Sequence, residues 1–201
     1  MTSIMLIDDH PLAVNGIGAW LTGTGKYKIA GTAGTLDKAS KLIEDSSLMP
    51  EIVILDISLG IENGLDFIPR LKNICEKRKL PMPGILVCSM YEDPFLIKQA
   101  MESGADAYVP KSADSDEILK AIGEILNGNT YINEKYQITE PEHIWNNLTR
   151  RENEIVSLLK RNFSTAQISK NLFISIRTVE NHLSNIYEKT GVNKKDELIN
   201  L

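Results

Sequence analysis

Residues 4–11 read IMLIDDHP, an apolar run that ends in two adjacent carboxylates. Four consecutive apolar residues are typical of a strand that is buried on both faces of a parallel sheet. Adjacent carboxylates repel each other, so Asp8 and Asp9 require something that offsets the repulsion. Water, a cation or the N-terminus of a following helix can do so. The rest of the sequence decides among them.

Four more apolar runs follow, at spacings that leave room for a helix between each pair of runs. The five predicted strands are residues 4–7, 29–33, 52–55, 85–89 and 107–109. The stretches between them carry apolar residues on one helical face, as Leu36, Ala39 and Ile43 do. Strands that alternate with helices in this way predict an α/β fold with a doubly wound, five-stranded parallel sheet.

The composition is that of an ordinary globular chain. Of the 201 residues, 42% are hydrophobic and 24% are charged. The longest apolar runs are far shorter than the ~20 residues that a membrane helix needs, and no secretory signal is recognisable at the N-terminus. The two cysteines, Cys75 and Cys88, form no CxxC pair, which fits a reducing compartment. We therefore expect a cytoplasmic protein without a membrane partner.

Charge divides the chain into two parts. Residues 1–143 contain 13 Lys and Arg against 21 Asp and Glu, whereas residues 144–201 contain 9 against 6. An acidic first part and a mildly basic second part suggest two modules with different partners. Nucleic acid is a candidate partner of the basic module; the alternative is an uneven surface charge without a function.

Polar side chains lie at the ends of four of the predicted strands. Asp8 and Asp9 follow the first strand, Asp56 the third and Lys111 the fifth, while Ser89 ends the fourth. In a doubly wound sheet these ends meet at one edge, where the site lies. Three carboxylates form the kind of oxygen cage that Mg²⁺ occupies beside a substrate phosphate. Because a carboxylate can attack phosphorus, we expect phosphoryl transfer to Asp56 and an acyl phosphate product.

The segments LIDDHPLAVNGI, PEIVILDISLGIENGLDFI, ILVCSM and GADAYVPKSADSDEILKAI resemble the receiver domain of bacterial two-component response regulators, over residues 1–127. The resemblance implies a flavodoxin-like fold, with Asp56 as the phosphoacceptor and a sensor histidine kinase as the phosphoryl donor. The residues that it implies for Mg²⁺ are Asp8, Asp9, Asp56 and, through its backbone carbonyl, Ser58. The residues that it implies for phosphoryl contact and switching are Lys111, Ser89 and Tyr108.

A linker and a helical module follow the predicted receiver. Residues 128–147 show no clean period and contain glycine, proline and several asparagines, which predicts a linker. Residues 148–201 carry repeated helix-start signals. The predicted N-caps are Thr149 and Ser164, each in a capping box, then Ser175 and Asn193. Two middle helices joined by a tight turn predict a helix-turn-helix within a small, all-α, four-helix domain.

The second helix of this pair, expected from Ser175 to Gly191, presents two faces. The apolar residues, expected to face inward, are Ile176, Val179, Leu183, Ile186 and Tyr187. The residues expected to face outward are Arg177, Glu180, Asn181, Ser184 and Asn185. Because Asn can pair with adenine and Glu can accept a hydrogen bond from cytosine, the outward face suits the DNA major groove. The alternative is the solvated face of an ordinary helical domain.

The stretch LTRRENEIVSLLKRNFSTAQISKNLFISIRTVENHLSNIYEKTGV, residues 148–192, resembles the LuxR-type helix-turn-helix of the NarL/FixJ response regulators. In that family the positions of Glu180, Asn181 and Ser184 face bases, and lysine is frequent where Glu180 stands. The positions that lie near the DNA backbone are those of Arg177, Thr178 and His182. The implied partners are double-stranded DNA and RNA polymerase, and the phosphorylated protein is expected to be a homodimer.

Two other functions fit parts of the sequence. A Mg²⁺-dependent phosphatase of the haloacid dehalogenase type also uses an Asp after a strand, but it needs a second acid where this chain has Ser58, and it leaves residues 148–201 unexplained. A regulator that works without phosphorylation, and keeps the pocket as a relic, is disfavoured by the intact set of Asp8, Asp9, Asp56, Ser89 and Lys111. One departure from the receiver pattern is Gly60, where proline is usual. It implies a more flexible loop and affects the lifetime of the acyl phosphate.

Overall fold

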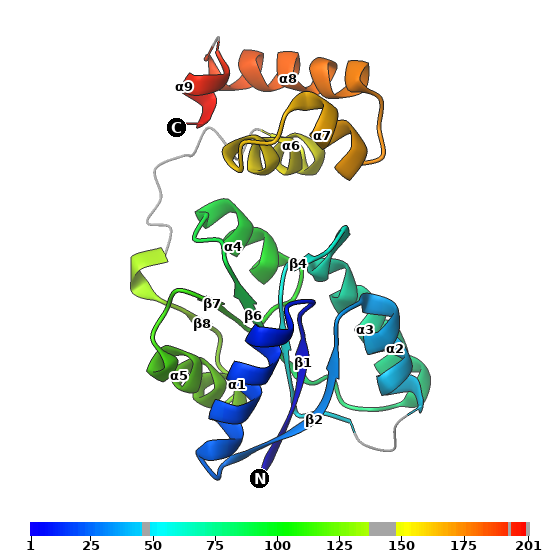
Figure 1. Cartoon of the computed structure of the whole chain (residues 1–201), viewed down its shortest axis with the longest axis vertical. Helices are drawn as coiled ribbons and strands as arrows, with labels where there is room; N and C mark the ends of the chain where they lie inside the picture. Colours follow the sequence, from blue (N-terminus) through cyan, green and yellow to red (C-terminus); the bar gives the residue numbers. More distant parts are fainter. Residues whose placement is uncertain (46–48, 137–147, 193, 200–201) are drawn as a thin grey trace. The chain divides into compact units, whose positions relative to one another are not determined.

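The computed structural model describes residues 1–45, 49–136, 148–192 and 194–199. The chain divides into two compact units, Met1–Gln137 and Ile138–Leu201 (Figure 1). Within the described ranges, no helix has both the length and the apolar character that a membrane span requires.

The first unit is built on one parallel sheet. Its strands are β1 (Thr2–Ile7), β2 (Tyr27–Ala33), β3 (Ile52–Leu55), β6 (Gly84–Ser89), β7 (Ala107–Pro110) and β8 (Tyr131–Ile132). They lie in the order β2-β1-β3-β6-β7-β8, and each strand is parallel to its neighbours. The predicted doubly wound parallel sheet is therefore confirmed, with a sixth, short strand added at one edge.

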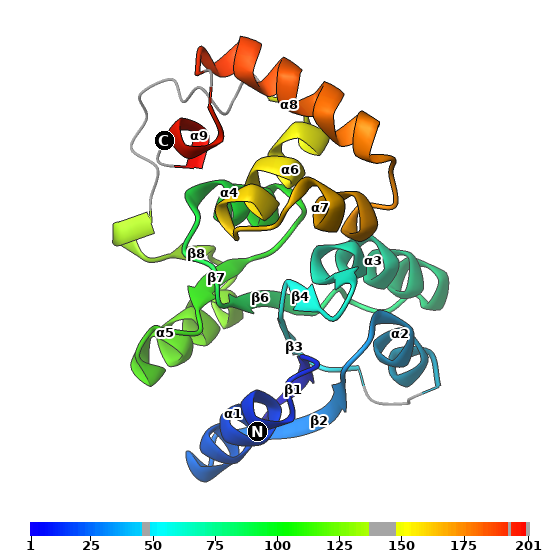
Figure 2. The ribbon, with the colours of Figure 1, turned by 45° about the horizontal axis from the view of Figure 1, so that its top comes forward.

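Helices cover both faces of this sheet. They are α1 (Pro11–Gly23), α2 (Leu36–Asp45), α3 (Phe67–Arg78), α4 (Pro94–Glu102) and α5 (Ser115–Leu126), with short 3-10 turns η1 (Gly64–Asp66) and η2 (Glu134–Tyr136). Residues of α1 and α5 share one apolar cluster with the sheet, and residues of α2, α3 and α4 share the other. Figure 2 shows α2 and α3 side by side, away from α1 and α5.

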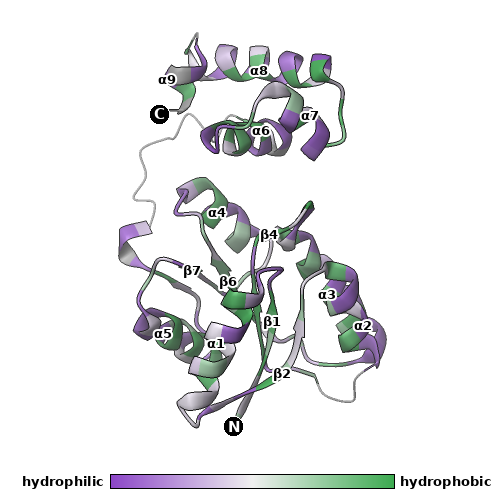
Figure 3. Cartoon of the chain, in the orientation of Figure 1, coloured by the Kyte–Doolittle hydropathy of each residue, from purple (hydrophilic) through white to green (hydrophobic). Residues whose placement is uncertain are grey.

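The apolar run of β1 serves both clusters. Ile4 and Leu6 pack into the cluster of α1 and α5, whereas Met5 and Ile7 pack into the opposite one. None of the four is more than 2% exposed, and each such burial contributes about 1.5–3 kcal/mol relative to exposure. Successive side chains of a strand point to opposite faces, so a strand covered on both sides must be apolar throughout. In Figure 3 much of β1 is coloured green.

The sixth strand lies inside the stretch that the sequence predicted as a linker, residues 128–147. Gly128, at a φ of 79°, turns the chain after α5, and the Tyr131 amide then donates to the Asp106 carbonyl at 2.9 Å. Tyr131 pairs with Ala107 of β7. The predicted domain boundaries remain predictions, but residues 131–136 belong structurally to the first unit. Residues 137–147 of the predicted linker lie outside the described residues.

The second unit is helical, as predicted. Its helices are α6 (Arg150–Lys160), α7 (Thr165–Asn171), α8 (Ile176–Thr190) and α9 (Lys195–Ile199). They enclose one apolar core, whose buried members include Ile155, Leu159, Ile168, Val179 and Ile186.

Three of the four predicted N-caps are present. Thr149 and Glu152 exchange both hydrogen bonds of a capping box, at 3.3 and 2.7 Å. Ser164 and Gln167 do the same at 3.3 and 2.9 Å, and Ser175 caps α8. Each cap of this kind is worth about 1 kcal/mol of helix stability. The fourth predicted cap, at residue 193, lies outside the described residues.

A charged contact ties the end of α8 to the start of α6. The Lys189 ammonium lies 2.7 Å from Glu152 Oε2, and the Glu152 side chain is 3% exposed. Burial alone would raise the pKa of Glu152, but hydrogen bonds from Lys189 and Thr149 outweigh it and lower that pKa. The carboxylate that caps α6 is thus also the partner of a cation from α8.

Candidate functional site

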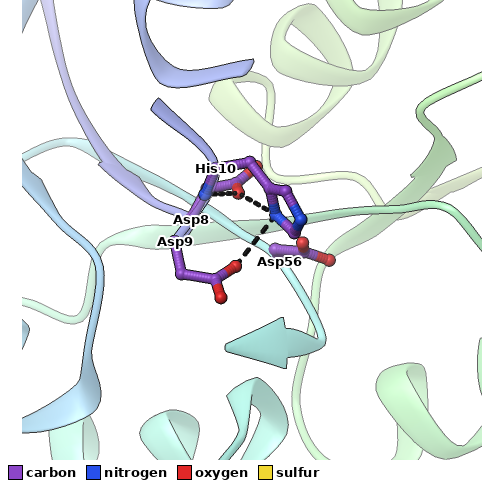
Figure 4. A group of neighbouring side chains, drawn as sticks. All are labelled: Asp8, Asp9, His10 and Asp56. Atoms are coloured by element: carbon purple, nitrogen blue, oxygen red, sulfur yellow. Dashed lines mark hydrogen bonds and ion pairs between the residues drawn. The ribbon is translucent and has the colours of Figure 1, made fainter. Parts of the chain in front are cut away.

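The carboxyl ends of the strands place a cluster of charges at one edge of the sheet. β1 ends at Ile7, and Asp8 and Asp9 follow it; β3 ends at Leu55, and Asp56 follows. Ligand atoms of these three carboxylates and of His10 all lie within 4.8 Å of one another. Figure 4 shows the four side chains gathered there. Parallel register produces this meeting, since Ile7 pairs with Leu55 across the β1–β3 ladder.

Lys111 bridges two of the carboxylates from the end of β7. Its Nζ lies 2.5 Å from Asp8 Oδ2 and 2.7 Å from Asp56 Oδ2, and the Lys111 side chain is 12% exposed. Burial raises the pKa of Asp56, and the ammonium opposes that rise only in part. Burial alone would lower the pKa of Lys111, but its two carboxylate partners outweigh burial and raise it. Lys111 is therefore held as a cation beside Asp56.

Asp9 and His10 form the outer rim of the cluster. Asp9 Oδ2 accepts a hydrogen bond from the Gly60 amide at 2.9 Å, and its Oδ1 lies 2.9 Å from His10 Nδ1. The His10 ring is also 3.2 Å from Asp8 Oδ1, and 66% of it is exposed. Gly60 has a φ of 59°, a conformation that glycine adopts without strain. Gly60 therefore binds a pocket carboxylate through its backbone, which proline could not do for lack of an N–H.

The loop after Asp56 approaches the pocket closely. The Ser58 amide donates to Asp56 Oδ1 at 3.3 Å, and the short hairpin of β4 (Ser58–Leu59) and β5 (Glu62–Asn63) follows. A Cβ at Gly64 would lie 1.9 Å from the Asp56 carbonyl oxygen. Glycine is therefore required there for the loop to fold back onto the backbone of Asp56, directly after β3. The role of the Ser58 carbonyl as a metal ligand remains a prediction.

Ser89 ends β6 and Tyr108 lies in the neighbouring strand β7, and both are fully buried. Ser89 Oγ has no hydrogen-bond partner among the described residues. The Tyr108 hydroxyl donates to the Tyr91 carbonyl at 2.8 Å, and burial raises the pKa of Tyr108, an effect that the nearby Ser89 hydroxyl partly counters. The aromatic ring of Tyr108 is thus held inside the fold. The phosphoryl-contacting role of Ser89 and the switching role of Tyr108 remain predictions.

Glu92 links the loops beside the pocket to the segment after α5. It accepts a hydrogen bond from Ser112 Oγ at 2.6 Å, and its other oxygen lies 3.3 Å from Lys135 Nζ. The Ser112 hydrogen bond, with those of Tyr136 and Lys135, lowers the pKa of Glu92 to about 2. Ser112 directly follows Lys111, and Lys135 lies in η2. Glu92 therefore connects the loop after β7 to η2.

The second unit contains the predicted helix-turn-helix. Phe173, at a φ of 54°, forms the turn between α7 and α8. Ser169 Oγ donates to the Ile174 carbonyl at 2.5 Å, and Arg151 donates to the Leu172 carbonyl at 2.6 Å. Side chains from α6 and α7 therefore hold the tight turn from within the unit.

Most of the predicted DNA-contacting residues are accessible on α8. Arg177, Glu180, Asn181 and Ser184 are exposed, whereas Thr178 and His182 are half-buried. Thr178 Oγ1 lies 2.8 Å from the N-cap hydroxyl of Ser175, so it also supports the helix start. Ile176, predicted on the inward face, is instead 48% exposed. Ile176 is the first residue of α8, and the apolar core of the second unit does not extend to this end of the helix.

Both units match known families. The response regulator receiver domain matches residues 4–123, and the luxR family of bacterial regulatory proteins matches residues 146–201. The first match alone spans more than half of the chain. The chain belongs to the NarL/FixJ-type response regulators. This response regulator joins a receiver to a LuxR-type DNA-binding domain, and it is a two-component regulator of transcription.

Several known proteins are similar to this chain along nearly its whole length. The transcriptional regulatory protein MctR of Rhizobium johnstonii is 29% identical over 200 residues, covering 98% of this chain and 90% of MctR. LiaR of Bacillus subtilis is 29% identical over 206 residues, covering 98% and 94%. The structure of RcsB from Salmonella enterica serovar Typhimurium bound to promoter rprA has a TM-score of 0.59 and 22% identity, covering 100% of this response regulator and 97% of that chain. That likeness concerns the fold.

Sequence reasoning missed three groups beside the receiver pocket. His10 belongs to the opening motif, and its adjacency to two aspartates was a usable signal. Tyr91 and Glu92 lie two and three residues after Ser89. Their contacts arise from loops that meet only in the fold, so no local pattern revealed them.

Proposed function

We propose that Asp56 accepts a phosphoryl group from a partner histidine kinase, and that this modification controls how α8 binds DNA. One observation carries the proposal: the Asp56 carboxylate is 3% exposed, lies 2.7 Å from the Lys111 ammonium and shares its pocket with Asp8 and Asp9. The proposed nucleophile Asp56, the cation Lys111 and two further carboxylates thus meet at the carboxyl edge of the sheet. That set serves phosphoryl transfer, which needs positioning and charge neutralisation more than proton transfer.

In the proposed step an Asp56 oxygen attacks the phosphorus of a phosphohistidine. The new P–O bond forms as the P–N bond breaks, and the electron pair of the P–N bond stays on the imidazole. Lys111 neutralises the phosphoryl oxygens that approach it. The pocket's hard oxygen donors suit Mg²⁺, with Asp8, Asp9, Asp56 and the Ser58 carbonyl as its ligands; a bound Mg²⁺ would supply further charge neutralisation.

Ser89 and Tyr108 are proposed to report the modification. The buried Ser89 hydroxyl has no partner among the described residues, so a phosphoryl oxygen within reach would gain a donor without breaking another hydrogen bond. Tyr108 is positioned next to it through its bond to the Tyr91 carbonyl. A local charge change of this kind can bias a two-state element.

The DNA-reading residues are proposed to lie on α8. Glu180, Asn181 and Ser184 would face bases, while Arg177, Thr178 and His182 would lie near the DNA backbone. The phosphorylated protein would bind as a homodimer at paired half-sites, in the cytoplasm, with RNA polymerase as a further proposed partner. The exposure of the first three side chains supports this assignment.

The phosphatase alternative has less support. It needs an acid two residues after the nucleophile, and Ser58 instead places its hydroxyl 3.2 Å from the Tyr91 hydroxyl. The relic alternative gives no reason for the three contacts that hold Lys111 and Asp9 in place.

Intact mass spectrometry after incubation with acetyl phosphate tests the phosphoacceptor. We expect one Mg²⁺-dependent phosphoryl adduct on the wild-type protein and on Asp116→Asn, which removes an exposed carboxylate of α5. Asp56→Asn should take up none while keeping its circular dichroism spectrum. An adduct that persists in folded Asp56→Asn would overturn the assignment.

A further inference from the structure

The outward face of α8 carries a carboxylate that DNA phosphates repel. Glu180 is exposed, and neither Glu180 nor Arg177 forms an ion pair with another described residue. Ser184, one turn later, donates its hydroxyl to the Glu180 backbone carbonyl at 3.1 Å, so it leaves the Glu180 carboxylate unpartnered. A free carboxylate at this place weakens attraction to any DNA sequence, because non-specific binding depends on phosphate neutralisation. Glu180 must therefore gain something from particular bases if α8 binds DNA well.

The edges of the bases restrict what that gain can be. An ionised carboxylate only accepts hydrogen bonds. In the major groove guanine presents the acceptors N7 and O6, and thymine presents the acceptor O4 and a methyl group. Cytosine presents the N4 amino donor without a neighbouring acceptor, whereas adenine couples its amino donor to the N7 acceptor. Cytosine is thus the base that a carboxylate on α8 favours.

Ile176 adds a second observation on the same face. It begins α8 and is 48% exposed, and the i, i+4 spacing places it one turn from Glu180. A large apolar side chain on the exposed face of a helix gains when a partner covers it. In the major groove the apolar feature of a base edge is the thymine methyl group.

We propose that Glu180 and Ile176 set the sequence preference of this regulator, selecting a cytosine and a nearby thymine in each half-site. The inference rests on the proposed function that α8 enters the major groove. It assigns base identities to that contact: Glu180 accepts a hydrogen bond from cytosine N4, and Ile176 covers the thymine methyl group. A non-cytosine base opposite Glu180 should weaken binding roughly 5- to 150-fold.

The test is selection of binding sites from random-sequence duplexes by the full-length protein treated with acetyl phosphate. Wild type should enrich a cytosine and a nearby thymine within each half-site. Glu180→Gln should change the cytosine to adenine, because Gln bonds both adenine N6 and N7. Ile176→Ala should lose the thymine preference alone. Glu188→Gln, an exposed acid eight residues further along α8, is the matched control and should select the wild-type sequence.

The outcomes separate the inference from the function on which it rests. If Glu180→Gln and Glu180→Ala select the wild-type sequence and bind every duplex more tightly, Glu180 only repels phosphate and the cytosine assignment is wrong. If Ile176→Ala keeps the thymine, the assignment of Ile176 is wrong. In both cases DNA binding by α8 stands. If the wild-type protein enriches no sequence at all, the proposed function fails and the inference fails with it.

Discussion

Replacement of Lys111 by methionine should lower the free energy of unfolding of the receiver. Low pH and Mg²⁺ should each restore part of the lost stability. Lys111 is the ammonium between Asp8 and Asp56, at 2.5 and 2.7 Å, and its side chain is 12% exposed. Methionine keeps most of the length and the apolar stem but removes the charge. Two nearly buried carboxylates would then face each other without a cation from the protein.

The size of the effect follows from this burial. Removing one member of a buried ion pair costs about 3–5 kcal/mol, because the remaining charge is left uncompensated. The Lys111 side chain is not fully buried, being 12% exposed, so we take the lower value, about 3 kcal/mol. That corresponds to a roughly 150-fold loss in protection against hydrogen exchange. Mg²⁺ at about 100 times its Kd would return about 2.7 kcal/mol, since it binds the folded pocket.

The sign of the pH effect comes from Asp56. Burial raises its pKa above the ordinary 3.8 in the folded protein, and loss of Lys111 raises it further. The folded state therefore binds the proton more tightly than the unfolded state. The stability gained from the protonated carboxyl is fully present below the unfolded pKa and is lost as the pH rises through the raised pKa. The stability that Lys111→Met loses relative to wild type should thus become smaller as the pH falls.

Hydrogen exchange of the β3 amides, corrected for the intrinsic rate at each pH, measures this in the full-length protein. Lys41→Met, which removes an exposed lysine of α2, is the matched control and should match wild type. A Lys111→Met deficit that stays the same at low pH and with Mg²⁺ would refute the charge argument and leave packing as the cause. Wild-type protection in Lys111→Met would refute the ion pair itself.

Three further changes test other parts of the molecule. Gly64→Ala should slow acetyl phosphate-driven uptake by Asp56, measured as an initial rate, because the new Cβ would lie 1.9 Å from a backbone oxygen. Glu92→Gln should speed amide exchange in η2 at neutral pH. The pKa of Glu92 is lowered to about 2 in the folded protein. The stability that the ionised Glu92 gives to η2 is therefore present above pH 4.5 and is lost as the pH falls through about 2. Lys189→Met should cost about 1–2 kcal/mol, read from exchange in α6, because Glu152 keeps its backbone partner while the lysine is 34% exposed. For each substitution, an uptake rate or an amide exchange rate equal to that of the wild-type protein would contradict the structural reason given.

The sheet and the pocket were predictable for the same physical reason. A parallel strand covered on both faces must be apolar throughout, so residues such as Ile4–Ile7 stand out as uninterrupted runs. The first polar residue after such a run must lie at the carboxyl edge of the sheet, so the amino-acid sequence alone places Asp8 and Asp56 there. Capping boxes are equally local, and those that begin at Thr149 and Ser164 form as predicted.

The errors arose where contacts between distant segments override local pattern. β8 has only two residues, too short for periodicity, and it exists because β7 offers it an open edge. Ile176 fits the apolar repeat of α8, yet it lies on the first turn, beyond the core that buries Val179. Glu92 is an ordinary loop acid in the sequence, and its partners Ser112 and Lys135 come from elements up to 43 residues away.

The charges in the pocket answer the question posed by its opening motif. Asp8, Asp9 and Asp56 bring three carboxylates, and Lys111 brings one ammonium that reaches only the first and the last of them. Asp9 instead accepts a hydrogen bond from the Gly60 amide and lies 2.9 Å from His10 Nδ1. The cluster therefore keeps an excess of negative charge that the protein's described residues do not neutralise. A phosphoryl group would add to this excess, so uptake by Asp56 should require a divalent cation, and the required ion should bind through Asp9, the carboxylate that Lys111 leaves unpaired.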